Sequence, residues 1–133
     1  MSTNSAPGFK QCPEHSITTK PADVRVTVTF RGEIIADTRD AVQLQEAVGS
    51  GKSTIAPVVY YFPRKDVNMG SLVRTSHRTY CPFKGEASYF SLKDGPENAV
   101  WSYEQPYDEM AVLEGRLAFY PDKVESIVTQ PKR

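Results

Sequence analysis

A strict alternation of apolar and polar residues near the start of the chain most constrains its fold. From Val24 to Phe30, valine or phenylalanine occupies every second position between arginines and threonines. This is the period-two pattern of a strand with one buried face. Arg31 and Gly32 can then turn the chain, because glycine tolerates the positive φ of tight hairpins. We expect a three-stranded meander over 24–30, 33–38 and 41–47.

Short apolar runs bounded by proline and glycine continue through the rest of the chain. Each run has strand length and is rich in β-branched or aromatic residues. Further strands are predicted over 57–62, 72–80, 87–92, 99–103 and 117–120. A helix is predicted over 106–114, where Pro106 suits the first turn and Gly115 suits the end. The predicted fold class is mainly β: a single-domain antiparallel half-open barrel or folded-over sheet with about one short helix.

The length of 133 residues suits one domain with one hydrophobic core. Residues 1–22 are rich in serine, threonine and proline and lack apolar periodicity. We therefore expect them to form an N-terminal tail that lies on the surface or is disordered. The predicted β-rich domain spans 23–128, and a C-terminal tail spans 129–133.

Charge and hydropathy narrow the class of partner. The chain has 16 lysines and arginines and 16 acidic residues, so no global field attracts nucleic acid or anionic lipid. No apolar run reaches the roughly 18 residues of a membrane helix, and the first residues lack the apolar core of a secretory signal. These features predict a cytoplasmic protein without nucleic-acid or membrane partners, in which Cys12 and Cys81 are free thiols.

The segment 51–54, GKST, is similar to the end of a phosphate-binding P-loop. The full motif needs a glycine where this chain has Glu46. It also needs a helix directly after the lysine, which Pro57 would interrupt. The segment is therefore predicted to be a plain Gly/Ser loop.

Four residues have side chains that bind zinc. Cys12 and His15 are spaced as C-x2-H, and His77 and Cys81 as H-x3-C. Mixed cysteine and histidine ligands suit a tetrahedral zinc site. However, the first pair falls in the expected tail, so bringing the ligands together would cost conformational entropy. We predict no bound metal.

The segment 75–86 combines a histidine, a thiol, cations and a carboxylate at one turn. His77 beside Cys81 would favour the thiolate and make Cys81 a nucleophile, and Lys84 could stabilise developing negative charge. A regular strand would keep His77 and Cys81 about 13 Å apart on one face, so contact requires a bend at Pro82. The alternative is that Cys81 is a small buried hydrophobe and Lys84 a solvated turn residue.

A ligand-binding mouth beside the Cys81–Gly85 turn is the primary functional hypothesis. Cations and aromatic rings at the open end of a half-open barrel suit a small anionic or planar ligand, or a protein partner. The predicted lining residues are Tyr61, Arg64, His77, Lys84 and Trp101. The alternative is an enzyme that uses Cys81 as nucleophile or Lys84 as electrostatic stabiliser. A homodimer is a further hypothesis, and no cofactor is expected.

Two motifs are similar to those of a known family: VYYFPRKDV over 59–67 and RTYCPFKGEASY over 78–89. ENAVWSY over 97–103 adds to them. On these motifs the chain resembles, from about residue 15 to 125, the domain of unknown function 427 family, which also has a provisional nucleotidyltransferase label. The resemblance implies a compact, mostly antiparallel half-open barrel. The label is not supported by the residues, because polymerase-type transfer needs clustered carboxylates for metal ions and the acidic residues here are spread singly.

Overall fold

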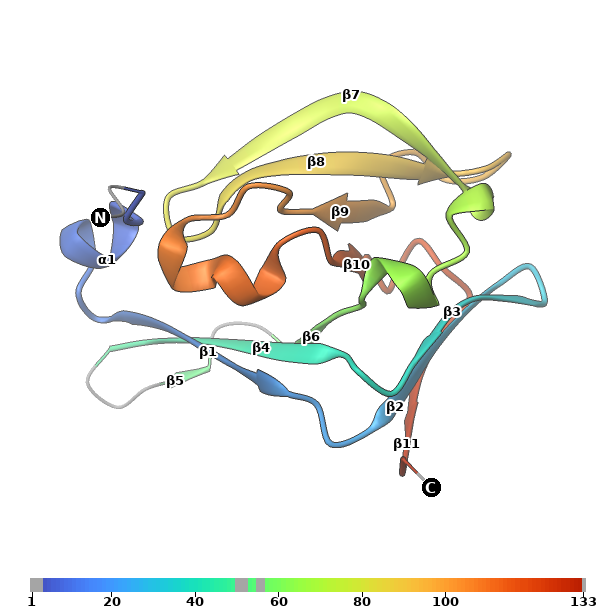
Figure 1. Ribbon diagram of the computed structural model, residues 1–133, viewed down its shortest axis with the longest axis horizontal. Coiled ribbons are helices and arrows are strands. Elements are labelled where there is room, and N and C mark those ends of the chain that lie inside the picture. The colour runs from blue at the N-terminus through green and yellow to red at the C-terminus, as the bar shows by residue number, and fades with distance from the viewer. Residues whose placement is uncertain (1–3, 50–52, 55–56, 133) are drawn as a thin grey trace.

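The computed structural model describes residues 4–49, 53–54 and 57–132, and its strands form three antiparallel sheets (Figure 1). The strands are β1 His15–Pro21, β2 Arg25–Phe30, β3 Glu33–Thr38, β4 Val42–Val48, β5 Ser53–Thr54, β6 Val59–Tyr61, β7 Leu72–Cys81, β8 Gly85–Leu92, β9 Val100–Ser102, β10 Leu117–Phe119 and β11 Ser126–Gln130. The helices are short: α1 Gly8–Gln11 and the 3-10 helices η1 Arg64–Asp66, η2 Met69–Ser71 and η3 Asp108–Leu113. The predicted fold class, mainly β and antiparallel, is confirmed.

Two of the sheets continue into one another. We call them the β4 sheet, in which β1, β5 and β6 join β4, and the β8 sheet, in the order β10-β9-β8-β7. Phe62 and Leu117 bridge the two through backbone hydrogen bonds of 2.7 and 2.9 Å. In the described residues, no strand pairing joins β1 to β7 to close the ring. The result is a half-open curved surface, and the third sheet, β11-β2-β3, is the β2 sheet.

The β8 sheet is packed on both faces, because successive side chains of a strand point to opposite sides. On β8, Ala87 and Tyr89 face one apolar cluster, whereas Phe90 and Leu92 face another. The inner cluster, between the β4 and β8 sheets, contains Val42, Leu44, Tyr61, Ala87, Tyr89, Tyr103, Met110, Leu113 and Ala118. The outer cluster contains the buried valines of β2. The core is thus divided in two by one sheet.

The predicted meander is wrong at its third strand. β2 and β3 pair as expected, through a turn in which Arg31 and Gly32 have φ of 52° and 79°. β4 instead pairs with β1 and β6. The chain turns after Thr38, whose hydroxyl donates to the Asp66 carboxylate over 2.7 Å and accepts the Asp40 N–H over 2.9 Å. This turn takes the chain out of the β2 sheet, where β11 supplies the third strand.

Part of the expected N-terminal tail is a strand. β1 pairs with β4 along its whole length, from His15 opposite Val48 to Pro21 opposite Val42. Ile17 is its only aliphatic residue, so backbone hydrogen bonds to β4, not an apolar stripe, hold it in place. The tail expected over 129–133 likewise overlaps β11, which runs to Gln130.

The predicted helix over 106–114 forms as the shorter 3-10 helix η3. Its backbone is irregular at Met110, where φ is −114° and ψ is 22°. The side chains of Met110 and Leu113 are buried in the inner cluster, and this packing takes precedence over regular α-helical geometry. No helix in the described part of the chain is long and apolar enough to cross a membrane.

The segment similar to a P-loop falls partly on residues 51 and 52, which lie outside the described residues. The two residues that follow form β5, which pairs with Ala47 and Val48 of β4. The last part of the motif is therefore a strand, whereas a P-loop requires a helix at that point.

Candidate functional site

An apolar pocket of about 410 Å³ lies beside β6, β10 and β11. Its lining residues are Pro57, Val58, Val59, Tyr60, Phe62, Trp101, Phe119, Tyr120, Pro121, Ile127 and Thr129. We call it the Trp101 pocket. None of these described side chains carries a formal charge, and the volume falls within the range usual for small-molecule sites.

Two aromatic side chains form a wall of this pocket. The rings of Trp101 and Tyr120 lie 4.5 Å apart between centroids, at 43° to one another. The Trp101 indole N–H donates to the Tyr61 hydroxyl over 3.2 Å. The Tyr120 hydroxyl lies 3.5 Å from that of Tyr89, which in turn lies 2.9 Å from the Thr79 hydroxyl. Polar groups of the inner cluster therefore fix the orientation of both rings.

Tyr61 is buried, with 2% of its surface exposed. Burial raises the pKa of its hydroxyl, and the negative charge of Glu46 adds to this, although the hydrogen bond from Trp101 acts in the opposite direction. The phenol therefore stays protonated at neutral pH. Tyr61 and Trp101 are two predicted site residues that the structure brings into contact.

Lys84 is buried and paired. Its ammonium donates to Glu46 Oε1 over 2.5 Å, and His15 Nε2 lies 2.9 Å from Glu46 Oε2. Burial acts to raise the pKa of Glu46, but the hydrogen bonds and charge of Lys84 and His15 outweigh burial and lower it. The His15 ring stacks on Phe83 at 4.0 Å. The alternative that Lys84 is a solvated turn residue is wrong, because only 8% of the surface of this residue is exposed.

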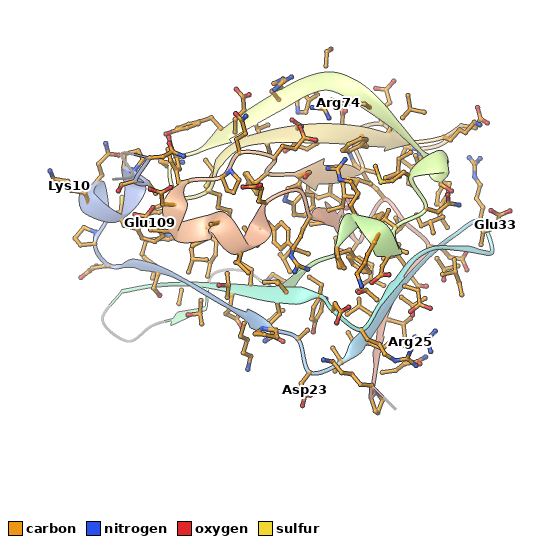
Figure 2. All side chains as sticks on the ribbon, in the orientation of Figure 1. Lys10, Asp23, Arg25, Glu33, Arg74 and Glu109 are labelled. Atoms are coloured by element: carbon orange, nitrogen blue, oxygen red, sulfur yellow. The ribbon has the colours of Figure 1, made fainter. Side chains whose placement is uncertain are left out.

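Arg64 forms an ion pair with a different carboxylate, that of Glu104. Its guanidinium donates to Glu104 over 3.3 Å and to the Gly115 carbonyl over 3.1 Å. Arg74, on the arched part of β7 in Figure 2, donates to the same carboxylate over 2.7 and 2.8 Å. Both guanidiniums lie 5.6 Å from the centre of the Phe90 ring. Arg64 and Lys84 are therefore held in separate ion pairs, Arg64 with Glu104 and Lys84 with Glu46.

The two candidate catalytic residues of β7 have separate surroundings. His77 is exposed, and its ring meets Tyr89 edge-on at 4.6 Å. The pairing of β7 with β8 shifts register between Arg74 and Arg78, so His77 lies in an irregular part of the strand. Cys81 is half-buried against the inner cluster. No hydrogen bond or ring contact among the described residues links His77 to Cys81.

The candidate zinc ligands also separate. Cys12 is exposed, and His15 is occupied by Glu46. In residues 4–49, 53–54 and 57–132, no group of three or more histidine, cysteine or acidic side chains could hold a metal ion.

The family model described as Domain of unknown function (DUF427) matches residues 18–130. The chain belongs to the DUF427 family. The resemblance in the 59–67 and 78–89 motifs is thus confirmed, and these motifs place Tyr61 and Lys84 of the DUF427 domain at the inner face of the curved surface. None of the curated proteins matches the chain.

Sequence analysis did not single out Glu46 as a functional residue of this DUF427 domain. The signal was present: Val42, Leu44 and Glu46 fall on one face of β4, so a carboxylate occupies the third position of an inward-facing row. A charge at such a position needs a partner, and Lys84 provides it.

Proposed function

We propose that this DUF427 domain binds a small, planar, uncharged molecule in the Trp101 pocket. The observation that carries the proposal is an apolar space of about 410 Å³ with tryptophan and tyrosine rings in its wall. Flat rings favour the stacking of a planar ligand, and a pocket without formal charge favours an uncharged one. An anionic ligand is less suited, because Lys84 and Arg64 already pair with carboxylates.

The side chains around the pocket are held in place without a ligand, so the binding site is preformed. Trp101 and Tyr120 are held from behind by Tyr61 and Tyr89, so few rotamers would be lost when a ligand binds. Thr129 supplies a polar group for orienting the ligand. The Trp101 pocket is not the mouth expected beside the Cys81–Gly85 turn, although Trp101 was predicted to line that mouth as well.

The test uses the chain's single tryptophan as its reporter. N-phenyl-1-naphthylamine, which is neutral and aromatic and absorbs where tryptophan emits, is titrated into the protein. We expect saturable quenching of Trp101 emission. The variant Thr129→Phe fills the pocket from β11 and should weaken the Kd about tenfold or more.

Val128→Phe is the matched control, because Val128 is the exposed neighbour on the opposite face of β11 and does not line the pocket. Equal Kd values for wild type, Thr129→Phe and Val128→Phe would show that the probe binds elsewhere and would refute the proposal. Quenching that never saturates would refute it as well.

A further inference from the structure

The Trp101 pocket passes between the edges of two strands instead of lying on one face of a sheet. Val59 and Tyr60 are successive residues of β6 and both line it, as do Phe119 and Tyr120 at the end of β10. Successive side chains of a strand point to opposite faces. Val59 and Tyr120 accordingly pack against the inner cluster, whereas Tyr60 and Phe119 pack with the outer one. A cavity that reaches both faces of both strands lies in a gap between their edges.

The gap opens where the pairing of β6 with β10 stops. The Phe62 N–H donates to the Leu117 carbonyl over 2.7 Å, and the Leu117 N–H donates to the Phe62 carbonyl over 2.9 Å. This bridge is antiparallel, so the next hydrogen-bonded pair along the two strands would be Tyr60 with Phe119. The described residues show no such pair. The ladder between the β4 sheet and the β8 sheet therefore ends after a single bridge.

The backbone of Tyr60 faces this gap. The hydrogen-bonding groups of a strand alternate between its two edges, so the N–H and C=O of Tyr60 point to the same edge as those of Phe62. The other edge of β6 is the one that pairs with β4. Tyr60 thus presents a donor and an acceptor side by side, without a partner strand. A wholly apolar ligand would remove both groups from water unpaired, which costs binding free energy.

We propose that the Trp101 pocket binds a planar lactam, a ring in which an amide N–H and its C=O lie side by side on one edge. The lactam C=O accepts the Tyr60 N–H, and the lactam N–H donates to the Tyr60 C=O, which continues the interrupted ladder. The rings of Trp101 and Tyr120 contact the face of the ligand. An uncharged amide suits a pocket whose described lining side chains carry no formal charge. This inference rests on the proposed function and adds the chemical class of the ligand.

The experiment compares 2-quinolinone, a planar lactam, with 1-methyl-2-quinolinone, in which a methyl group replaces the amide proton. Both are uncharged and bicyclic, and both absorb where tryptophan emits, so each titration follows the quenching of Trp101. We expect the methyl compound to bind about tenfold more weakly, because it cannot donate to the Tyr60 C=O. Thr129→Phe should weaken the Kd for 2-quinolinone several-fold, and Val128→Phe should leave it unchanged, because only Thr129 lines the pocket.

A second measurement tests the named contact with Tyr60. Hydrogen exchange of ¹⁵N-labelled protein is followed by NMR with and without saturating 2-quinolinone. The ligand should slow the exchange of the Tyr60 amide more than that of the Tyr61 amide, because the Tyr61 N–H already faces β4.

The lactam inference and the proposed function fail in different ways. If N-phenyl-1-naphthylamine binds the pocket but the two quinolinones have equal Kd values, the lactam inference is overturned and the proposed function stands. Tighter binding of the methyl compound, equal effects of Thr129→Phe and Val128→Phe on 2-quinolinone, or a Tyr60 amide that gains no protection would overturn the lactam inference in the same way. Quenching that does not saturate with any of the three compounds would overturn both.

Discussion

Trp101 and Tyr61 meet at right angles, with ring centres 6.2 Å apart and the indole N–H donating to the Tyr61 hydroxyl over 3.2 Å. The contact joins β9 to β6 and thereby the β8 sheet to the β4 sheet. It also places the apolar ring of Trp101 against the pocket while its single polar atom faces the inner cluster. One hydrogen bond thus supports both the fold and the proposed ligand wall.

Removing that hydrogen bond should be visible in both stability and fluorescence. Tyr61→Phe leaves the buried indole N–H without its acceptor, which should lower the free energy of unfolding by about 1–2 kcal/mol. Urea unfolding followed by the emission of Trp101 measures the loss, and the native emission should change in wavelength. Tyr107→Phe, which removes a surface phenol paired with Tyr80 at 2.6 Å, should leave the emission wavelength unchanged. The same wavelength for both variants would contradict the assigned role of Tyr61.

The Glu46–Lys84 pair should be strongly coupled. Glu46→Gln and Lys84→Met each leave a largely buried partner charge, so each should cost about 2–3 kcal/mol, and the double variant should cost less than their sum. The exposed pair Arg78–Glu86, at 2.9 Å, is the matched control and should show coupling of about 0.5 kcal/mol or less. Chemical denaturation of the four variants of each cycle gives both values. Equal coupling in the two cycles would show that burial adds nothing to the Glu46 contact.

Glu104 should make stability sensitive to acid. The hydrogen bonds from Arg74 lower the pKa of Glu104 below the ordinary 4.5. Burial opposes this lowering, and the charges of Arg74 and Arg64 add to it. A carboxyl whose pKa is lowered in the folded state stabilises the protein above its unfolded pKa, and this stabilisation is lost as the pH falls through the folded pKa. We therefore expect the urea midpoint of the wild type to fall as the pH drops below about 4.5.

Two variants test this origin of the acid sensitivity. Glu104→Gln removes the titrating group, and Arg74→Met removes the largest cause of its lowered pKa. Both should give a shallower loss of the urea midpoint below pH 4.5 than the wild type. Wild-type slopes in both variants would assign the acid sensitivity to another carboxyl.

The segment around α1 should control the exposure of the β7–β8 turn. The Gly8 N–H donates to the Pro82 carbonyl over 2.9 Å, and a Cβ at Gly8 would come within 2.6 Å of the Phe83 ring. Gly8→Val should therefore lift α1 from the turn and expose the neighbouring Cys81. In a Cys12→Ser background, we expect iodoacetamide to alkylate Cys81 roughly tenfold faster in this variant.

The control for this experiment is Lys10→Val, which adds the same side chain at an exposed position of α1. It should keep the alkylation rate of the background. An unchanged rate in Gly8→Val would show that α1 does not cover Cys81. Thermal unfolding of each variant separates local opening from loss of the whole fold.

Local patterns predicted the strands that carry their own apolar face. The alternation over 24–30 and the turn at Arg31 are found in β2 and its hairpin with β3. β1 escaped prediction because its pairing with β4 is made by backbone groups, which leave no periodic signal in the sequence. The sheet that β4 joins was also not predicted, because it depends on a side-chain hydrogen bond between Thr38 and Asp66, which are 28 residues apart in the chain.

The residue types of the candidate site could be predicted from the sequence, but the contacts between those residues could not. Its aromatic character followed from Trp101 and Tyr61, which the sequence already placed together. Sequence analysis named Lys84 as a candidate site residue but not its partner Glu46, which lies 38 residues earlier on another strand. Which carboxylate neutralises which cation depends on the pairing of sheets, and the local spacing of charges does not specify it.

The burial of β8 on both faces has a consequence for how the molecule comes apart. Tyr89 belongs to the inner cluster, and Phe90, the next residue, belongs to the outer one. Because both clusters pack on β8, loss of either cluster should destabilise the other. The described sheets should therefore unfold in one cooperative step, with the calorimetric enthalpy equal to the van't Hoff enthalpy. In hydrogen exchange, the amides of β8 and β9 should be the last to open, at the free energy of global unfolding.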